Sequence, residues 1–206
     1  MDGDAAPLAE LADASAATDA ILIVDEAHAF GVLGPGGRGL CAAATVEPDV
    51  LIGTLGKAVG SAGGFVAGAL ALRELLVNRA RTFIFTTALP PPVAAAAAAG
   101  VDLIAGPEGD RRRAQLNERR QALGDALVGR GLVARIPTGP ILPLVLGSEA
   151  RALAVAEALS ARGLFIPAIR PPTVPAGSSR LRITMSSAHE PADLARLLAA
   201  LAEVLA

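Results

Sequence analysis

Residues 21–40, ILIVDEAHAFGVLGPGGRGL, begin with an apolar run that ends abruptly at Asp25, Glu26 and His28. A short run rich in β-branched residues followed by polar groups is typical of a buried parallel strand that delivers side chains to the carboxyl edge of a sheet. In open α/β sheets, ligands bind at that edge. The two acids are also compatible with a solvated strand end, so the strand alone does not decide between a site and a surface.

Two further apolar runs follow, Val50–Ile52, which leads into the glycine-flanked Lys57, and Phe65–Ala67. The strand ends should therefore place Asp25, His28 and Lys57 near one another. A lysine amine can form a Schiff base with an aldehyde cofactor, and a carboxylate favours a protonated pyridine nitrogen. A histidine can hydrogen-bond the phenolic oxygen of such a ring. These are the partners that pyridoxal phosphate needs to act as an electron sink.

The sequence Asp25-Glu26-Ala27-His28 also resembles the second motif of DEAH-type helicases. Such enzymes need a G-x-x-x-x-G-K-[ST] phosphate loop as well. The segment 53–58, GTLGKA, has a different glycine spacing and no hydroxyl after the lysine, and it follows the acidic motif instead of preceding it. The helicase hypothesis is therefore disfavoured.

The composition is that of a globular chain of 206 residues with 52% hydrophobic residues and a net charge of −2. Acids and bases are intermixed, which predicts neither a nucleic-acid partner nor a membrane surface. The single cysteine, Cys41, suits a reducing cytoplasm and is expected to be buried. The longest uncharged stretch, 82–101, contains three consecutive prolines, so no membrane span is expected. No metal ligand set is predicted.

Periodicity and turn signals predict strand–helix alternation first and an antiparallel α+β arrangement later. Helices are expected at 8–17, 69–80, 94–99, 108–130, 148–162 and 191–205, and strands at 21–24, 50–52, 65–67, 83–85, 141–146, 164–169 and 181–184. The arginine-rich part of the helix at 108–130 is interpreted as a solvated face.

Five segments carry a resemblance to a known family: 1–11, 24–40, 53–68, 83–92 and 170–190. Together they resemble the α-oxoamine synthases, pyridoxal-phosphate enzymes of the aspartate-aminotransferase fold (fold type I). The resemblance implies an α/β fold in which residues 1–106 are the C-terminal part of the large cofactor domain. Residues 107–206 would be a linking helix and a small α+β domain. The family has a further domain-sized stretch before the position of Met1, so the chain is expected to correspond to a C-terminal half.

The resemblance also implies cofactor contacts. Lys57 would hold pyridoxal phosphate, Asp25 would bind the ring nitrogen and His28 the ring oxygen. Thr54 would contact the phosphate, together with Thr86 and Thr87 from the neighbouring subunit of a homodimer with shared active sites. By position alone, Thr86 and Thr87 could instead cap the helix that follows.

Substrate contacts are implied at Thr173 and Arg182, with Arg182 holding the amino-acid carboxylate. Arg180 and Arg182 are two residues apart on an expected strand, so their side chains share a face. An arginine fork binds a carboxylate through two hydrogen bonds. A surface salt bridge is the alternative for either arginine, and Arg170 is a weaker substrate candidate.

Within the family, the double proline of the segment 170–175, RPPTVP, resembles the branch that makes 8-amino-7-oxononanoate. That branch condenses L-alanine with a pimeloyl thioester, on coenzyme A or acyl carrier protein, and releases carbon dioxide in biotin biosynthesis. The alternatives are another α-oxoamine synthase, such as the aminoketobutyrate type, or a catalytically incomplete fragment. A cytoplasmic location is expected.

Overall fold

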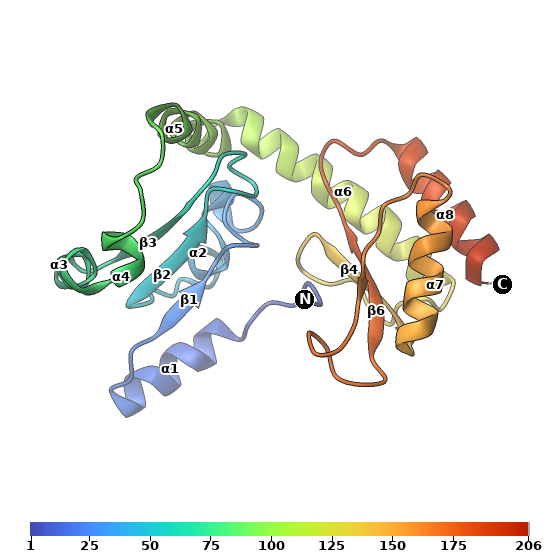
Figure 1. The fold of residues 1–206 in the computed structure, drawn as a ribbon, viewed down its shortest axis with the longest axis horizontal. Coiled ribbons are helices and arrows are strands. Elements are labelled where there is room, and N and C mark those ends of the chain that lie inside the picture. The colour runs from blue at the N-terminus through green and yellow to red at the C-terminus, as the bar shows by residue number, and fades with distance from the viewer. Residues whose placement is uncertain (206) are drawn as a thin grey trace. The chain divides into compact units, whose positions relative to one another are not determined.

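The computed structural model describes residues 1–205, which form two compact units (Figure 1). One unit is Ala6–Arg113, and the other combines Met1–Ala5 with the chain from Ala114 onwards. The chain therefore passes between the units twice, once near its start and once within the long helix α6 (Pro107–Gly129). The domain boundary near Gly106 that the resemblance implies stays a prediction.

The unit Ala6–Arg113 is built on a three-stranded sheet in the order β1 (Ile23–Asp25), β2 (Val50–Thr54) and β3 (Gly64–Gly68). β1 and β2 are parallel, and β3 returns antiparallel to β2. The three predicted strands are therefore confirmed. Around the sheet lie α1 (Leu8–Thr18), the short helices η1 (Pro35–Gly37) and α2 (Leu40–Ala44), α3 (Leu70–Arg79), α4 (Arg81–Ile84) and α5 (Pro91–Ala105).

The strand predicted at 83–85 is wrong, because this segment belongs to the helical turn α4. The amides of Phe83 and Ile84 each donate to the carbonyl of Ala80 at 3.0 Å, which closes the turn locally. Phe83 and Phe85 are 65% and 77% exposed. A three-residue apolar run carries too little periodicity to separate a strand from a helix. The helix α5 that follows has no side-chain cap, so the capping alternative for the two threonines is not observed.

The second unit contains an antiparallel sheet, as predicted, and its strand order is β4 (Ile141–Gly147), β6 (Ser179–Thr184) and β5 (Ala168–Ile169). Helices α7 (Glu149–Ser160) and α8 (Pro191–Leu205) pack with it (Figure 1). Their shared core includes leucines that are almost completely buried: Leu142, Leu144, Leu159, Leu181 and Leu201. Burial of such side chains contributes about 1.5–3 kcal/mol each, so this unit has a substantial core of its own.

The strand predicted at 164–169 is shorter than expected, because only Ala168 and Ile169 pair with β6. The amide of Leu164 donates to the carbonyl of Leu159 at 3.0 Å, which ties the start of the segment to the end of α7. Phe165 is 90% exposed. Pro167 lacks an amide hydrogen, so it can only accept in the ladder, and it does so from Arg182 at 3.0 Å.

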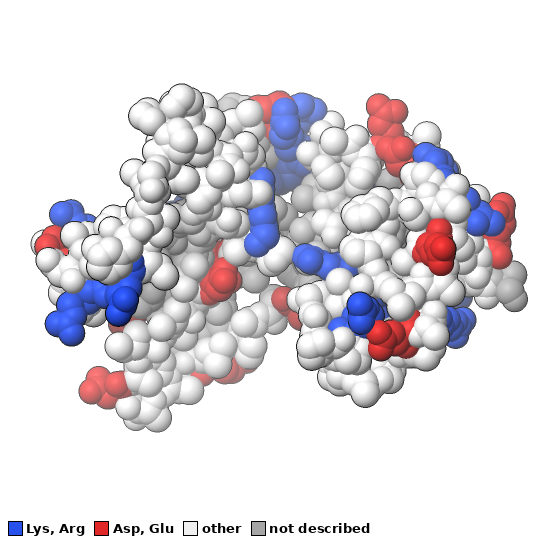
Figure 2. All heavy atoms as spheres, in the orientation of Figure 1, with Lys and Arg blue, Asp and Glu red and all other residues white. Residues whose placement is uncertain are grey.

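Charged side chains of both signs are interspersed over the visible surface (Figure 2). On α6, Arg111 and Arg112 bind Glu108 at 2.7 Å and fit the expected solvated face. Arg113 does not, because its side chain is 13% exposed and donates to the carbonyl of Ile104 at 2.9 Å. Among residues 1–205, no helix is both long and apolar enough to cross a membrane.

Candidate functional site

Asp25 lies at the carboxyl end of β1, directly beside Ile52 of the parallel strand β2. Asp25 is exposed, and its Oδ1 accepts a hydrogen bond from the amide of Ala27 at 2.8 Å. The amide of Glu26 donates to the carbonyl of Ile52 at 2.8 Å and so extends the parallel pairing by one residue. The chain then turns, and Asp25 is left facing outwards at the edge where the sequence predicted a site.

Glu26 is buried, with 2% exposure, and fixes the turn that follows Asp25. Its two carboxylate oxygens accept from the amides of Leu40 at 2.9 Å and Cys41 at 2.6 Å, at the start of α2. Burial, together with the hydrogen bond and negative charge of Glu26, raises the pKa of the Cys41 thiol to about 12. Cys41 is therefore an unreactive core residue, as expected, and Glu26 positions the loop instead of facing a ligand.

Lys57 lies on the loop between β2 and β3, and two apolar side chains anchor this loop on either side of it. Val59 is 6% exposed and packs with Ala97 and Ile104 of α5, and Leu55 packs against the same cluster. The amide of Gly60 donates to the carbonyl of Lys57 at 3.0 Å. Lys57 itself is exposed. Its amine is therefore presented from a fixed loop, on the same sheet edge as Asp25.

Thr54 and the residues around it stiffen the end of β2. Thr54 Oγ1 accepts from the amide of Gly56 at 3.2 Å and donates to the carbonyl of Gly63 at 3.3 Å. The preceding Gly53 lies under the ring of Phe65, where a Cβ would be 2.3 Å from Cζ. Phe65 in turn meets Phe30 edge-to-face with ring centroids 5.3 Å apart. The strand β3, into which the Lys57 loop leads, and the turn after Asp25 thus share one aromatic contact.

The unit Ala6–Arg113 contains all the predicted cofactor contacts: Asp25, His28, Thr54, Lys57, Thr86 and Thr87. Parallel pairing brings the ends of β1 and β2 together, as the sequence indicated. His28 is exposed on the turn after Asp25. Thr86 and Thr87 are exposed between α4 and α5. The assignment of these residues to a cofactor stays a prediction.

The predicted substrate contacts, Thr173 and Arg182, belong to the other unit. Thr173 is exposed, and its amide donates to the carbonyl of Arg170 at 3.0 Å in a tight turn. The Arg170 guanidinium bonds Glu149 at 2.8 Å, so the weaker candidate is engaged in a surface ion pair. His189 Nδ1 accepts from the amide of Ser186 at 3.2 Å, which gives this side chain a structural role at the turn before α8.

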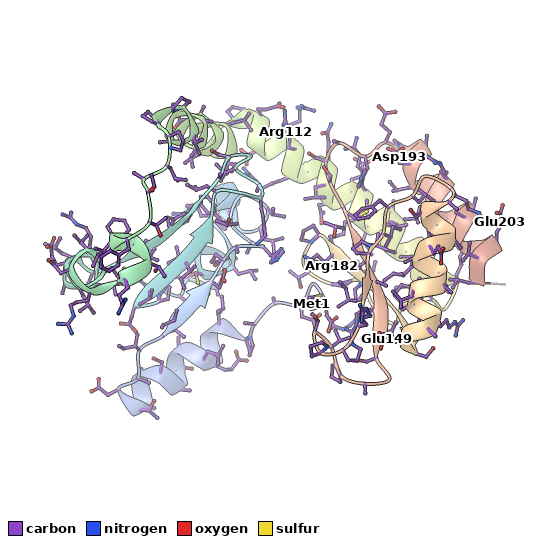
Figure 3. All side chains as sticks on the ribbon, in the orientation of Figure 1. Met1, Arg112, Glu149, Arg182, Asp193 and Glu203 are labelled. Atoms are coloured by element: carbon purple, nitrogen blue, oxygen red, sulfur yellow. The ribbon has the colours of Figure 1, made fainter. Side chains whose placement is uncertain are left out.

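Arg182 lies on β6 (Figure 3) and lines a pocket of about 480 Å³ within its unit. Thr184 and His189 also line this pocket, together with apolar side chains of the core. Arg182 Nε is shielded from solvent and has no hydrogen-bond partner among the described residues. A guanidinium with an unused donor beside a pocket can bind an anionic group such as a carboxylate.

The lysine content of the chain gives the site a further property. Lys57 is the only lysine in the 206 residues, whereas arginine occurs 17 times. An aldehyde that reacts with side-chain amines can therefore bind this chain covalently at one side chain only. No cluster of three or more His, Cys, Asp or Glu residues that could hold a metal ion occurs in the described part of the chain.

Comparison with known proteins gives consistent matches. The model of the family "Aminotransferase class I and II" matches residues 1–201. The 8-amino-7-oxononanoate synthase of Anaeromyxobacter dehalogenans (strain 2CP-C) is 56% identical over 207 residues, which cover 100% of this chain and 52% of the relative. The chain thus spans about half the length of the curated relatives it matches.

Solved structures of similar fold agree with this result. A serine palmitoyltransferase from S. paucimobilis with a bound PLP–myriocin aldimine has a TM-score of 0.91 and 32% identity, over 99% of this chain and 53% of that one. The 8-amino-7-oxononanoate synthase of Francisella tularensis has a TM-score of 0.77 and 27% identity, over 94% and 57%. The resemblance found in the sequence is confirmed, and the chain belongs to the aminotransferase class I and II family.

Proposed function

We propose that this chain supplies the lysine-bearing half of a pyridoxal-phosphate-dependent 8-amino-7-oxononanoate synthase. The complete enzyme would condense L-alanine with a pimeloyl thioester and release carbon dioxide. The observation that carries the proposal is the single lysine, Lys57, exposed on an anchored loop at the sheet edge that also holds Asp25. The 50–56% identity to oxononanoate synthases supports this activity as the first choice, ahead of the aminoketobutyrate type.

The residues at this edge fit pyridoxal phosphate by the chemistry of their donors. Lys57 offers an amine to the aldehyde, Asp25 a carboxylate to the ring nitrogen and Thr54 a hydroxyl towards the phosphate. Thr54 Oγ1 donates its one hydrogen to the carbonyl of Gly63 at 3.3 Å, a bond that it would exchange for one to the phosphate. When bound, the cofactor would supply an electron sink for the carbanion formed at the substrate Cα.

The protein groups would then have distinct tasks. Lys57 Nζ would hold the cofactor at rest and, once displaced by the substrate amine, would take the α-proton. The Asp25 carboxylate would keep the ring nitrogen protonated, because a nearby negative charge favours the charged form. His28 would orient the ring through its oxygen. Arg182, with Thr173 nearby in sequence, would hold the carboxylate of the amino acid.

The assembled enzyme is proposed to be a cytoplasmic homodimer in which Thr86 and Thr87 complete the phosphate site of the neighbouring subunit. Both threonines are exposed, as that role requires. Exposed apolar residues are frequent in the same unit, including Ile23, Leu70 and Phe85 at 59%, 67% and 77% exposure. Contiguous exposed apolar surface is typical of sites where other polypeptide packs, and these side chains are candidates for such a contact.

Borohydride trapping of pyridoxal phosphate on the purified chain tests the proposal. The chain has no second lysine with which the labelling of Lys57 could be compared. The α-amine of Met1 therefore serves as the internal reference. Peptide mass mapping would follow labelling of both amines as the cofactor concentration rises. Lys57 should saturate at a concentration at least tenfold below that for Met1. This preference should disappear in urea and in an Asp25→Asn variant.

Equal labelling of the two amines in the native chain would show that Lys57 is not held in a formed site, and the chain would then be a catalytically incomplete fragment. Glu47→Gln is the matched control for Asp25→Asn, since Glu47 is also an exposed acid of the same unit. It should leave the preference for Lys57 unchanged. A loss of preference in this control would mean that overall charge, not Asp25, governs the reaction.

A further inference from the structure

Arg180 and Arg182 project from the same face of β6, but their surroundings differ. Arg180 is only 7% exposed. Its Nη1 forms an ion pair with Asp2 Oδ1, and its Nε donates to the carbonyl of Ser178 at 2.9 Å. A buried guanidinium is stable only when its charge is compensated. Asp2, which is 178 residues away in the sequence, provides that compensation.

Arg182 has no such partner. Its Nε is buried without a hydrogen bond, and none of the ion pairs among residues 1–205 involves it. An unsatisfied buried donor costs about 1–3 kcal/mol, which a bound anion would recover. Two other charged side chains line the same pocket, and both are engaged. Asp193 accepts from the amide of Glu190 at 2.8 Å, and Arg196 donates to the carbonyl of Arg162.

The position of Asp2 is fixed by its neighbours in the chain. Gly3 has φ +72°, and a Cβ at this residue would lie 2.2 Å from the carbonyl oxygen of Ile141. The Gly3 carbonyl accepts from the amide of Gly139 at 2.9 Å, and Asp4 binds Arg135 at 2.7 Å. These contacts hold residues 1–5 against the unit that contains β6. Figure 3 shows Met1 beside that sheet.

We infer that Asp2 is a positioning residue for the substrate carboxylate, because it neutralises Arg180 and leaves Arg182 as the one free guanidinium on that face of β6. The inference rests on the proposed function. Residues two apart on a strand are separated by about 6.6 Å. A carboxylate offered two free arginines at that separation would bind at two positions. Only one of these positions could hold the amino group of the same substrate at the cofactor.

The test is an NMR titration of the chain with isotope-labelled arginine, using sodium acetate as the carboxylate probe. The Nε–H signals of the two arginines are assigned from Arg180→Lys and Arg182→Lys, each of which removes one signal. In the wild type, only the Arg182 signal should shift, and the shift should saturate. In Asp2→Asn, which is nearly isosteric, the Arg180 signal should also show a saturable shift.

Two control variants separate the charge of Asp2 from its packing. Asp2→Glu retains the charge, so acetate should not shift the Arg180 signal in this variant. Asp4→Asn removes the neighbouring ion pair to Arg135 and should leave the wild-type pattern unchanged. The inference is overturned if Arg180 responds to acetate in the wild type, or if it stays silent in Asp2→Asn. The inference is also overturned if acetate does not shift the Arg182 signal. The cofactor assignment is tested independently, by the labelling of Lys57.

Discussion

Replacement of Glu26 should destabilise the edge of the sheet that carries Asp25. Glu26 is 2% exposed, and both of its oxygens accept backbone amides, from Leu40 and Cys41. Its own backbone is bonded too, since its amide donates to Ile52 and its carbonyl accepts from the turn that follows. This one side chain therefore joins the end of β1 to the start of α2.

The magnitude follows from these two bonds. A hydrogen bond to a charged acceptor contributes about 1.5–3 kcal/mol, so Glu26→Ala, which removes both, should lower the free energy of unfolding by about 3–6 kcal/mol. Glu26→Gln retains the shape and one acceptor oxygen, and its amide group would face one of the two backbone donors. It should cost about half as much. Against a typical stability of about 5–15 kcal/mol, the alanine variant should be close to unfolding in this unit.

The measurement combines urea unfolding, followed by far-UV circular dichroism, with hydrogen exchange of the peptide spanning 38–46. Fluorescence is unsuitable, because the chain has no tryptophan or tyrosine. The amides of Leu40 and Cys41 should exchange faster in both variants, and peptides from β4 and β6 should be unaffected. Glu47→Ala, at an exposed acid, is the matched control and should change stability by less than about 0.5 kcal/mol.

The reasoning would be refuted if Glu26→Ala cost less than about 1 kcal/mol while the amides of Leu40 and Cys41 kept their protection. Water or another side chain would then have to satisfy these amides as well as Glu26 does. In the wild type the loop packs closely against the carboxylate, because a Cβ at Gly39 would lie 2.5 Å from Glu26 Oε2.

Three other predictions follow. The pKa of the Cys41 thiol is raised from 9.0 to about 12 in the folded chain, so the unfolded chain loses this proton first as the pH rises. The free energy of unfolding should therefore fall above pH 9. Cys41→Ala should remove that part of the slope, which is readily seen because the chain has no tyrosine and one lysine. Gly53→Ala, whose Cβ would lie 2.3 Å from the Phe65 ring, should cost about 1–3 kcal/mol in urea unfolding. Gly56→Ala, whose nearest neighbour would be 3.6 Å away, should be nearly neutral. In a full-length synthase, Asp25→Asn should lower turnover by orders of magnitude with an unchanged circular dichroism spectrum, and a steady-state rate equal to that of the parent would contradict the role of Asp25.

The core of the fold could be predicted because its signals are local. β1 and β2 are short apolar runs that end at polar or glycine-rich segments, and parallel pairing brings their ends to one edge. Asp25 and Lys57 could therefore be placed together from the order of the chain. The segment 83–85 has a similar apolar composition, but the end of α3 immediately before it makes the hydrogen bonds that turn it into α4. The amino-acid composition of residues 83–85 does not reveal these hydrogen bonds.

The proposed substrate contacts were only partly predictable, for a different physical reason. Strand periodicity places Arg180 and Arg182 on one face, but it treats them as equivalent. They become different because Asp2 pairs with one of them, and Gly3 can hold Asp2 there only with its positive φ and with no side chain between it and Ile141. No pattern within β6 contains this information. The proposed choice of a carboxylate-binding arginine therefore depends on the first five residues of the chain, and a charge change at Asp2 should alter it while both arginines stay in place.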